Sequence, residues 1–132
     1  MQTKTIIISI LAIVVIVGGV ILLSNNNESN NGNQQVAGNV SMVDGKQIIT
    51  INAKGGYSPR ATTAKAGVPT VIKMNTQGTF DCSSALNIPS LGINKNLPSS
   101  GETLIDVPLQ SAGATIQGIC SMGMYNFSIH FN

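Results

Sequence analysis

The C-terminal part of the chain alternates apolar and polar residues with a period of two. The clearest case is residues 125–131, YNFSIHF, in which odd positions are apolar and even positions are polar. This alternation is typical of a half-buried β-strand, because successive side chains of a strand point to opposite faces. We therefore predict a strand whose odd-numbered face packs in the core, with His130 on the other face at the surface.

Four further short runs are rich in β-branched residues and also predict strands. They are residues 47–53, 70–74, 103–109 and 114–119. Segments rich in Gly, Pro, Asn and Ser separate the runs, at residues 54–56, 66–69, 87–89, 97–101 and 112–113. Short strands at this spacing are typical of an all-β sandwich or barrel, and no window of this region has a helical period.

The N-terminal part has a different pattern, since residues 6–23 form an uncharged apolar run. As a helix this run spans about 27 Å, close to the hydrocarbon thickness of a bilayer. The alternative is a cleaved secretory signal, but signal sequences have shorter apolar regions that end in a small-residue cleavage motif. Asparagines follow the run instead, so we expect residues 1–23 to be a single-pass membrane anchor.

The segment after the anchor predicts a flexible linker at residues 24–40. It is rich in Asn, and such a segment cannot bury enough apolar surface to offset the entropy of ordering. Lys4 precedes the apolar run of residues 6–23, whereas no Lys or Arg follows the run before Lys46. The positive-inside rule therefore places the remaining domain, residues 41–132, outside the cytoplasm.

Composition and charge narrow the function of this domain. Charged residues make up 9% of the chain and the net charge is +2, with basic residues scattered and without interleaved aromatics, which argues against nucleic-acid binding. His130 is the only histidine. Because no Ser-His-acid set, phosphate-binding Gly loop or paired-carboxylate motif stands out, we expect that the protein is not an enzyme.

Four sulfur-bearing residues supply the most distinctive chemistry. Cys82 and Cys120 are the two cysteines, and Met122 and Met124 follow the second one in the sequence CSMGMY. In an extended chain residues 120, 122 and 124 project to one side, on the face opposite the apolar one of residues 125–131. The sulfurs become available if the alternation breaks near Gly123, or if they lie on a rim beyond the strand end.

Thiolates and thioethers are soft ligands that prefer Cu(I). A structural zinc site normally takes four Cys or His ligands, and a blue-copper site needs two His and one Cys, which a single histidine does not provide. We therefore predict Cys82, Cys120, Met122 and Met124 as ligands of one or two Cu(I) ions. The alternative is a Cys82–Cys120 disulfide that closes an exported β-domain of structural or adhesive role.

Residues 52–131 resemble the bacterial cupredoxin-like domains that bind Cu(I). The resemblance rests on GYSP at 56–59, KAGVP at 65–69, Cys82 followed by IPSLGI at 88–93, LP at 97–98, GET at 101–103 and CSMGMY at 120–125. With the apolar N-terminal run, the layout is similar to that of membrane-anchored copper chaperones. The resemblance implies an all-β, cupredoxin-like Greek-key β-sandwich preceded by one transmembrane helix.

The same resemblance implies two Cu(I) sites of different affinity. Cys82 and Cys120 would form the tighter Cu(I) site. Met122 and Met124 would form a second, weaker site beside it that shares a cysteine sulfur and suits uptake and release. The implied role is that of a copper chaperone in copper resistance, which sequesters Cu(I) rather than catalysing a reaction.

The implied partner is the copper-binding domain of a copper-exporting P-type ATPase, with the chaperone itself expected to be a monomer. Delivery to a cytoplasmic domain would require residues 41–132 inside the cell, in conflict with the positive-inside rule.

Two residues depart from the family pattern, since Ser121 and Asp81 stand where Gly is usual. The second of them places a charge beside Cys82.

Overall fold

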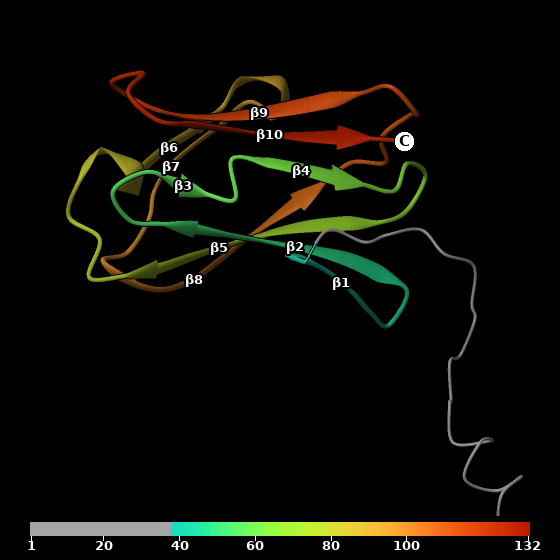
Figure 1. Ribbon diagram of the computed structural model, residues 1–132, viewed down its shortest axis with the longest axis horizontal. Coiled ribbons are helices and arrows are strands. Elements are labelled where there is room, and N and C mark those ends of the chain that lie inside the picture. Colours follow the sequence, from blue (N-terminus) through green and yellow to red (C-terminus); the bar gives the residue numbers. More distant parts are fainter. Residues whose placement is uncertain (1–37) are drawn as a thin grey trace, which may run out of the picture. The chain divides into compact units, whose positions relative to one another are not determined.

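The computed structural model describes residues 38–132. These residues form two five-stranded β-sheets that pack face to face (Figure 1). The predicted membrane anchor, residues 1–23, lies outside the described part of the chain, as does nearly all of the predicted linker, residues 24–40. Between residues 38 and 132, no helix has the length and apolar character needed to cross a membrane.

The first sheet has the strand order β1-β2-β5-β8, with the short strand β3 paired to β2. Its strands are β1 (Val40–Val43), β2 (Lys46–Ala53), β3 (Tyr57–Ser58), β5 (Thr70–Gln77) and β8 (Ser100–Val107). β2 and β5 run parallel, whereas the other pairs are antiparallel. Asp44 and Gly45 join β1 to β2, and both have the positive φ that a tight type I′ hairpin turn requires.

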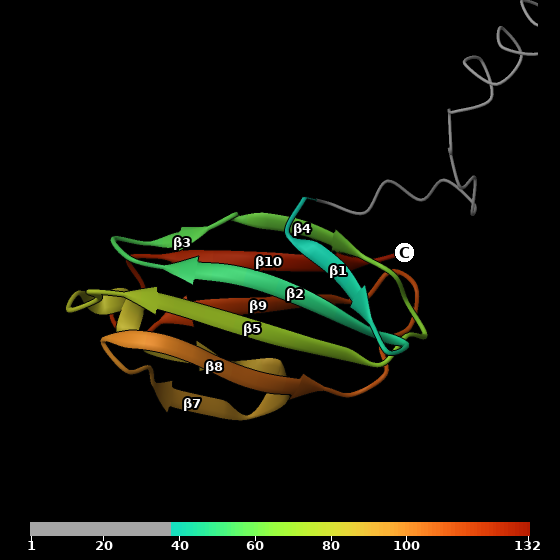
Figure 2. The same ribbon diagram turned by 90° about the horizontal axis from the view of Figure 1, so that it is seen from below.

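The second sheet has the strand order β4-β10-β9-β6-β7. Its strands are β4 (Ala61–Ala64), β10 (Asn126–Phe131), β9 (Thr115–Cys120), β6 (Ala85–Ile88) and β7 (Ile93–Asn96). Two 3₁₀ turns, η1 (Cys82–Ser84) and η2 (Pro89–Leu91), flank β6. Figure 2 shows the strands of the first sheet in front of β9 and β10.

The core lies between the two sheets and takes every second residue of the central strands. It includes Ile49 and Ile51 of β2, Ile72 and Met74 of β5, Leu86 and Ile88 of β6, and Phe127, Ile129 and Phe131 of β10. The predicted apolar face of the last strand is therefore confirmed. His130 is exposed on the opposite face, as the alternation predicted.

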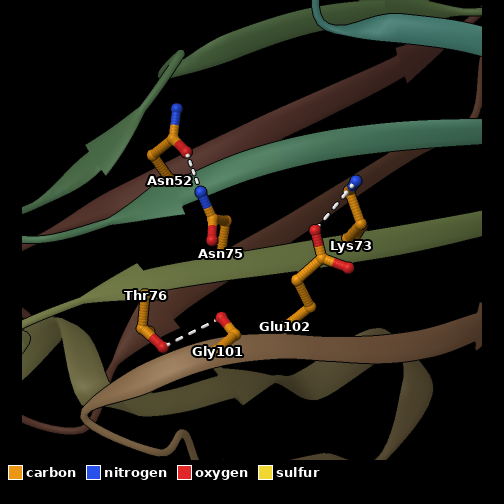
Figure 3. A network of polar contacts seen from close by, with 6 residues as sticks. All are labelled: Asn52, Lys73, Asn75, Thr76, Gly101 and Glu102. Carbon is orange, nitrogen blue, oxygen red and sulfur yellow. Dashed lines mark hydrogen bonds and ion pairs between the residues drawn. The ribbon is translucent and has the colours of Figure 1, made fainter.

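Polar contacts link β5 to its two neighbours in the first sheet (Figure 3). The Asn75 side chain donates to the Asn52 side chain at 3.0 Å. On the other side, Lys73 Nζ lies 3.1 Å from Glu102 Oε1. Both contacts are exposed to solvent, so they favour the observed register while contributing little to the free energy of unfolding.

All five predicted strands occur, although their ends differ from the prediction. The strand predicted at 103–109 is β8, which begins at Ser100 and ends at Val107. The breaks predicted at 87–89 and 97–101 are therefore wrong in part, since Ile88 belongs to β6 and Ser100 to β8. β1, β3, β4, β6 and β7 were not predicted, because runs of two to four residues are too short to show a period.

Candidate metal centre

Cys82 and Cys120 lie side by side at one end of the sandwich. Their sulfur atoms are joined as a disulfide, and their Cα atoms are 5.8 Å apart. The two residues are 38 positions apart in the sequence, so the fold rather than local chain geometry brings them together. A copper-binding pair of thiolates and a disulfide both require this proximity.

The pairing of β6 with β9 explains why the two cysteines meet. These strands run antiparallel, and Leu86 of β6 lies opposite Cys120, the last residue of β9. η1 leads directly into β6, which places Cys82 at the same edge. The Ser121 amide donates to the Ala85 carbonyl at 2.9 Å and extends this pairing one step past Cys120.

The two sulfur atoms differ in their access to solvent. Cys120 is 1% exposed and belongs to the hydrophobic core. Its Sγ accepts a hydrogen bond from the Tyr125 amide at 3.4 Å. Cys82 is only partly buried. A reactant therefore reaches the pair from the side of Cys82, while Cys120 forms the shielded side.

Met122 and Met124 lie on the turn of residues 121–125 that joins β9 to β10. The turn is closed by the Gly123 amide, which donates to the Cys120 carbonyl at 2.8 Å, and Gly123 takes a positive φ of 73°. Met122 is 75% exposed and Met124 is 62% exposed. Figure 1 shows this turn and the loop before β6 at the same end of the sandwich.

The extended-chain interpretation of residues 120–124 is therefore wrong. Cys120 ends β9 with its side chain in the core, whereas the two methionine side chains lie outside it. The turn at Gly123 breaks the alternation, and the sulfurs of Met122 and Met124 lie on a rim beyond the strand end, which was the other option. The buried Cys120 is thus followed in the chain by two accessible thioethers.

Asp81 caps the turn that carries Cys82. Its carboxylate accepts hydrogen bonds from the Ser83 amide at 2.8 Å and from the Ser83 hydroxyl. It also accepts from the Gly55 amide at 2.8 Å. Because the Ser83 hydroxyl and these amides favour the charged form, they hold the pKa of Asp81 below its usual value.

A buried hydroxyl supports the same turn from inside. Tyr57 donates to the Ser83 carbonyl at 3.1 Å, and its ring packs edge to face on Phe127 with centroids 5.1 Å apart. Burial, and then the nearby charge of Asp81, raise the pKa of Tyr57 to about 12.

Sequence reasoning singled out Asp81 only as a charge. The spacing Asp-x-Ser, a common N-cap pattern, is the signal that would have predicted its capping role.

Other candidate ligands lie elsewhere. His130 Nδ1 lies 3.2 Å from Thr115 Oγ1, and Thr115 begins β9 whereas Cys120 ends it. Across residues 38–132 no group of three or more His, Cys, Asp or Glu side chains is placed to hold a metal ion. A metal centre here would therefore combine the two cysteines with thioethers.

A shallow pocket adjoins the turn of residues 121–125. Its volume is about 340 Å³, and its lining comes from β3 and the loops on either side of it, from the turn of residues 121–125 and from the start of β10: Gly55, Gly56, Tyr57, Arg60, Met124, Tyr125 and Asn126. Gly56 packs beside the Tyr125 ring, and its positive φ of 127°, rather than a lack of space, is what favours glycine at this position. Met124 is thus reached from solvent across a polar hollow.

Two solved structures of known proteins have a similar fold. One similar structure is the metal-binding domain of the Cu(I)-exporting P-type ATPase CopA of Streptococcus pneumoniae D39 with Cu(I). It is 24% identical, has a TM-score of 0.61, and the match covers 70% of this chain and 92% of that domain. A copper binding protein solved by NMR in the apo form is also 24% identical, with a TM-score of 0.63 and coverage of 70% and 94%.

These two structures share the fold of residues 38–132 at low sequence identity. No curated protein sequence matches the chain. The sequence profile of the cupredoxin-like domain, however, matches residues 12–129, which is most of the chain. The chain therefore belongs to the cupredoxin-like domain family.

Proposed function

We propose that this chain is a membrane-tethered Cu(I)-binding protein that sequesters Cu(I) and passes it to a copper-exporting P-type ATPase. The observation that carries the proposal is the pairing of Cys82 with Cys120 beside the exposed thioethers of Met122 and Met124. The two structural relatives, which are a copper binding protein and a Cu(I)-bound ATPase domain, support it. The role is copper resistance without catalytic turnover.

The cysteine pair is the tighter site in this proposal. Once reduced, Cys82 and Cys120 present two thiolates from backbone positions 5.8 Å apart, close enough for both sulfurs to bind one ion. Cu(I) prefers soft donors such as these. Burial of Cys120 in the core keeps that side of the ion away from water, which favours retention of the bound ion.

The methionines form the weaker and more exchangeable site. Thioethers are neutral, flexible ligands, and both Met122 and Met124 face solvent. An ion held by them and by one cysteine sulfur is reachable by a partner. Such an ion enters and leaves without unfolding of the sandwich, because the turn of residues 121–125 lies outside the core.

The proposed recipient is the copper-binding domain of the ATPase. Residues 6–23 would confine the chaperone to the membrane in which the ATPase resides. Delivery to a cytoplasmic domain requires residues 41–132 on the cytoplasmic side, whereas Lys4 before the apolar run favours the outside. Protease treatment of intact cells decides between the two, since only an external domain is cleaved.

The test is a Cu(I) competition titration of the reduced full chain in detergent against a chromogenic Cu(I) chelator. We expect the protein to withdraw one ion tightly and a second ion more weakly. Cys82→Ser should abolish the tight step. If the reduced wild-type chain fails to compete for even one ion, the proposed function is wrong.

The disulfide supports a second candidate function, that of an exported structural or adhesive β-sandwich closed by Cys82 and Cys120. Small exported domains commonly use such a bond because their cores are small. Counting free thiols in protein isolated from cells under acid quench separates the candidates. The absence of free thiols in metal-free protein favours the disulfide-closed domain, whereas two thiols or bound copper favour the chaperone.

A further inference from the structure

We propose that Asp81 is a positioning residue for Cys82: its carboxylate ties the η1 turn to the loop between β2 and β3 and so holds the Cys82 sulfur against Cys120. The inference rests on the proposed function for the identity of the metal, Cu(I). The part of the inference that concerns the closeness of the two sulfurs does not depend on the proposed function. This closeness can also be measured without copper.

The two carboxylate oxygens of Asp81 serve different segments. Oδ1 accepts from the Ser83 amide at 2.8 Å and from the Ser83 hydroxyl. Oδ2 accepts from the Gly55 amide at 2.8 Å. One side chain therefore closes the turn that carries Cys82 and attaches this turn to a loop 26 residues earlier in the chain.

The residues on both sides of Cys82 are held by further contacts. The Asp81 carbonyl accepts from the Ser84 amide at 3.1 Å and from the Ser84 hydroxyl at 2.9 Å. Ser83 is fully buried, and its carbonyl accepts from the Tyr57 hydroxyl at 3.1 Å. With its neighbours fixed, the Cβ of Cys82 keeps one direction, which faces the end of β9.

A direct role of Asp81 as a copper ligand does not fit its surroundings. Both of its oxygens already accept hydrogen bonds from the chain. Carboxylate is also a hard ligand, which suits Mg²⁺ or Ca²⁺ rather than Cu(I). The negative charge is balanced by the donors of Ser83 and Gly55, so its main effect on Cys82 is geometric.

This geometric role predicts two parallel effects. The local concentration of one thiol at the other determines how readily they form a disulfide and how tightly they chelate one ion. If the tie is removed, η1 samples other positions and the local concentration falls. Both the disulfide equilibrium and the affinity of the cysteine pair for Cu(I) should weaken by a similar factor.

The test uses Asp81→Asn and Asp81→Ala in the full chain in detergent. Asn keeps one acceptor oxygen for Ser83 but presents an NH₂ group to the Gly55 amide, so it loses only the tie to that loop. Ala loses both ties. Asp106→Asn is the matched control, because it removes the same charge at a different place. Asp106 is exposed on β8.

The first measurement is the equilibrium of the protein with glutathione. Two glutathione thiols reduce the protein disulfide, which yields two protein thiols and one glutathione disulfide. We expect the protein disulfide to become about tenfold easier to reduce in Asp81→Ala, which is about 30 mV for two electrons. Asp81→Asn should lie between this variant and the wild type, and Asp106→Asn should match the wild type.

The second measurement is competition for Cu(I), in which the tight step should weaken about tenfold in Asp81→Ala. Unchanged thiol equilibrium and unchanged Cu(I) affinity, with only a lower melting temperature, would overturn the proposal and leave Asp81 a purely structural cap. If Asp81→Ala does not fold, Asp81→Asn carries both tests. If the wild type binds no Cu(I), the proposed function fails, while the glutathione equilibrium still decides the role of Asp81.

Discussion

Phe127 of β10 lies over Gly118 of β9, its direct partner across the two strands. A methyl group at Gly118 would lie closer than 3.0 Å to three atoms of the Phe127 ring. The absence of a side chain at this position thus lets a large aromatic ring fill the core between the sheets. On its other side β9 pairs with β6, which brings Cys120, two residues further along β9, next to Cys82.

Gly118→Ala should therefore lower the free energy of unfolding by about 2 to 3 kcal/mol, as expected for overpacking of a well-packed core. The cause is that Phe127 is 1% exposed and belongs to the hydrophobic core, so a shift of its ring disturbs the packing between the sheets. Urea unfolding curves measure the change. Gly38→Ala is the control, since a Cβ at Gly38 would meet nothing within 4 Å; an equal loss in both variants would contradict the argument.

The tyrosine under the Cys82 turn gives a pH-dependent prediction. The pKa of Tyr57 is about 12 in the folded protein, above its ordinary value of 10.0, because burial disfavours the charged form. The unfolded chain therefore loses this proton first, and stability falls as the pH rises from about 10 to about 12. Below pH 10 the contribution is complete.

Tyr57→Phe should remove that part of the alkaline loss of stability. Lysines titrate in the same range, so the informative quantity is the difference between wild type and variant across pH 9 to 12, measured by urea unfolding. Near neutral pH the variant should be destabilised by about 1 kcal/mol, because the Ser83 carbonyl loses its buried donor. Identical pH slopes in both proteins would show that the Tyr57 hydroxyl does not titrate as proposed.

The two methionines of the β9–β10 turn should matter for copper and not for stability. Met122→Leu and Met124→Leu should each weaken binding of the second Cu(I) ion about tenfold or more, because leucine keeps the apolar volume and removes the sulfur. The melting temperature should not change, since both side chains are exposed. Chelator competition monitors both binding steps in each variant.

Met42→Leu is the matched control for the turn methionines. Met42 is also more than half exposed, but it lies on β1, at the edge of the sheet that does not contain Cys120. It should leave both Cu(I) steps unchanged. Loss of the tight first ion in Met122→Leu or Met124→Leu, to the same extent as in Cys82→Ser, would contradict the division into two sites.

The strands that sequence reasoning predicted are those whose pattern is long enough to be recognised. Residues 125–131 alternate over seven positions, and the core face of β10 is the one predicted. β3 and β4 are too short for this. β4 exists because Ala61 to Ala64 pair in parallel with β10, a contact between distant segments that local pattern does not contain.

The candidate site was predictable in its chemistry and only partly in its geometry. Soft sulfur ligands were visible in the sequence CSMGMY, but Cys120 points inward with the alternation of β9, and the turn at Gly123 then separates the two methionines from that alternation, which an extended-chain picture ignores. The tie of Asp81 to Gly55 and the hydrogen bond from Tyr57 to Ser83 each join residues 26 positions apart. Such contacts follow from the pairing of the sheets and carry no signal in a local window.

The oxidation state of the cysteine pair should determine how copper affects stability. A bond that closes a loop of this length stabilises a folded chain by roughly 4 kcal/mol in the chain-entropy model. Reduction of the Cys82–Cys120 disulfide should therefore lower the free energy of unfolding by up to about this amount. The reduced pair is then free to bind Cu(I).

Cu(I) added to the reduced protein should restore much of that loss, because a ligand that binds only the folded state stabilises it by about 2.7 kcal/mol at 100 times its dissociation constant. Cu(I) should stabilise the oxidised protein far less. Its two cysteine sulfurs are bonded to each other in the disulfide, so only the thioethers of Met122 and Met124 remain as ligands. Melting curves of both forms with and without a buffered Cu(I) supply measure the difference. Equal stabilisation of the two forms would mean that copper binds elsewhere than at the cysteine pair, and no stabilisation of the reduced form would favour the disulfide-closed structural domain.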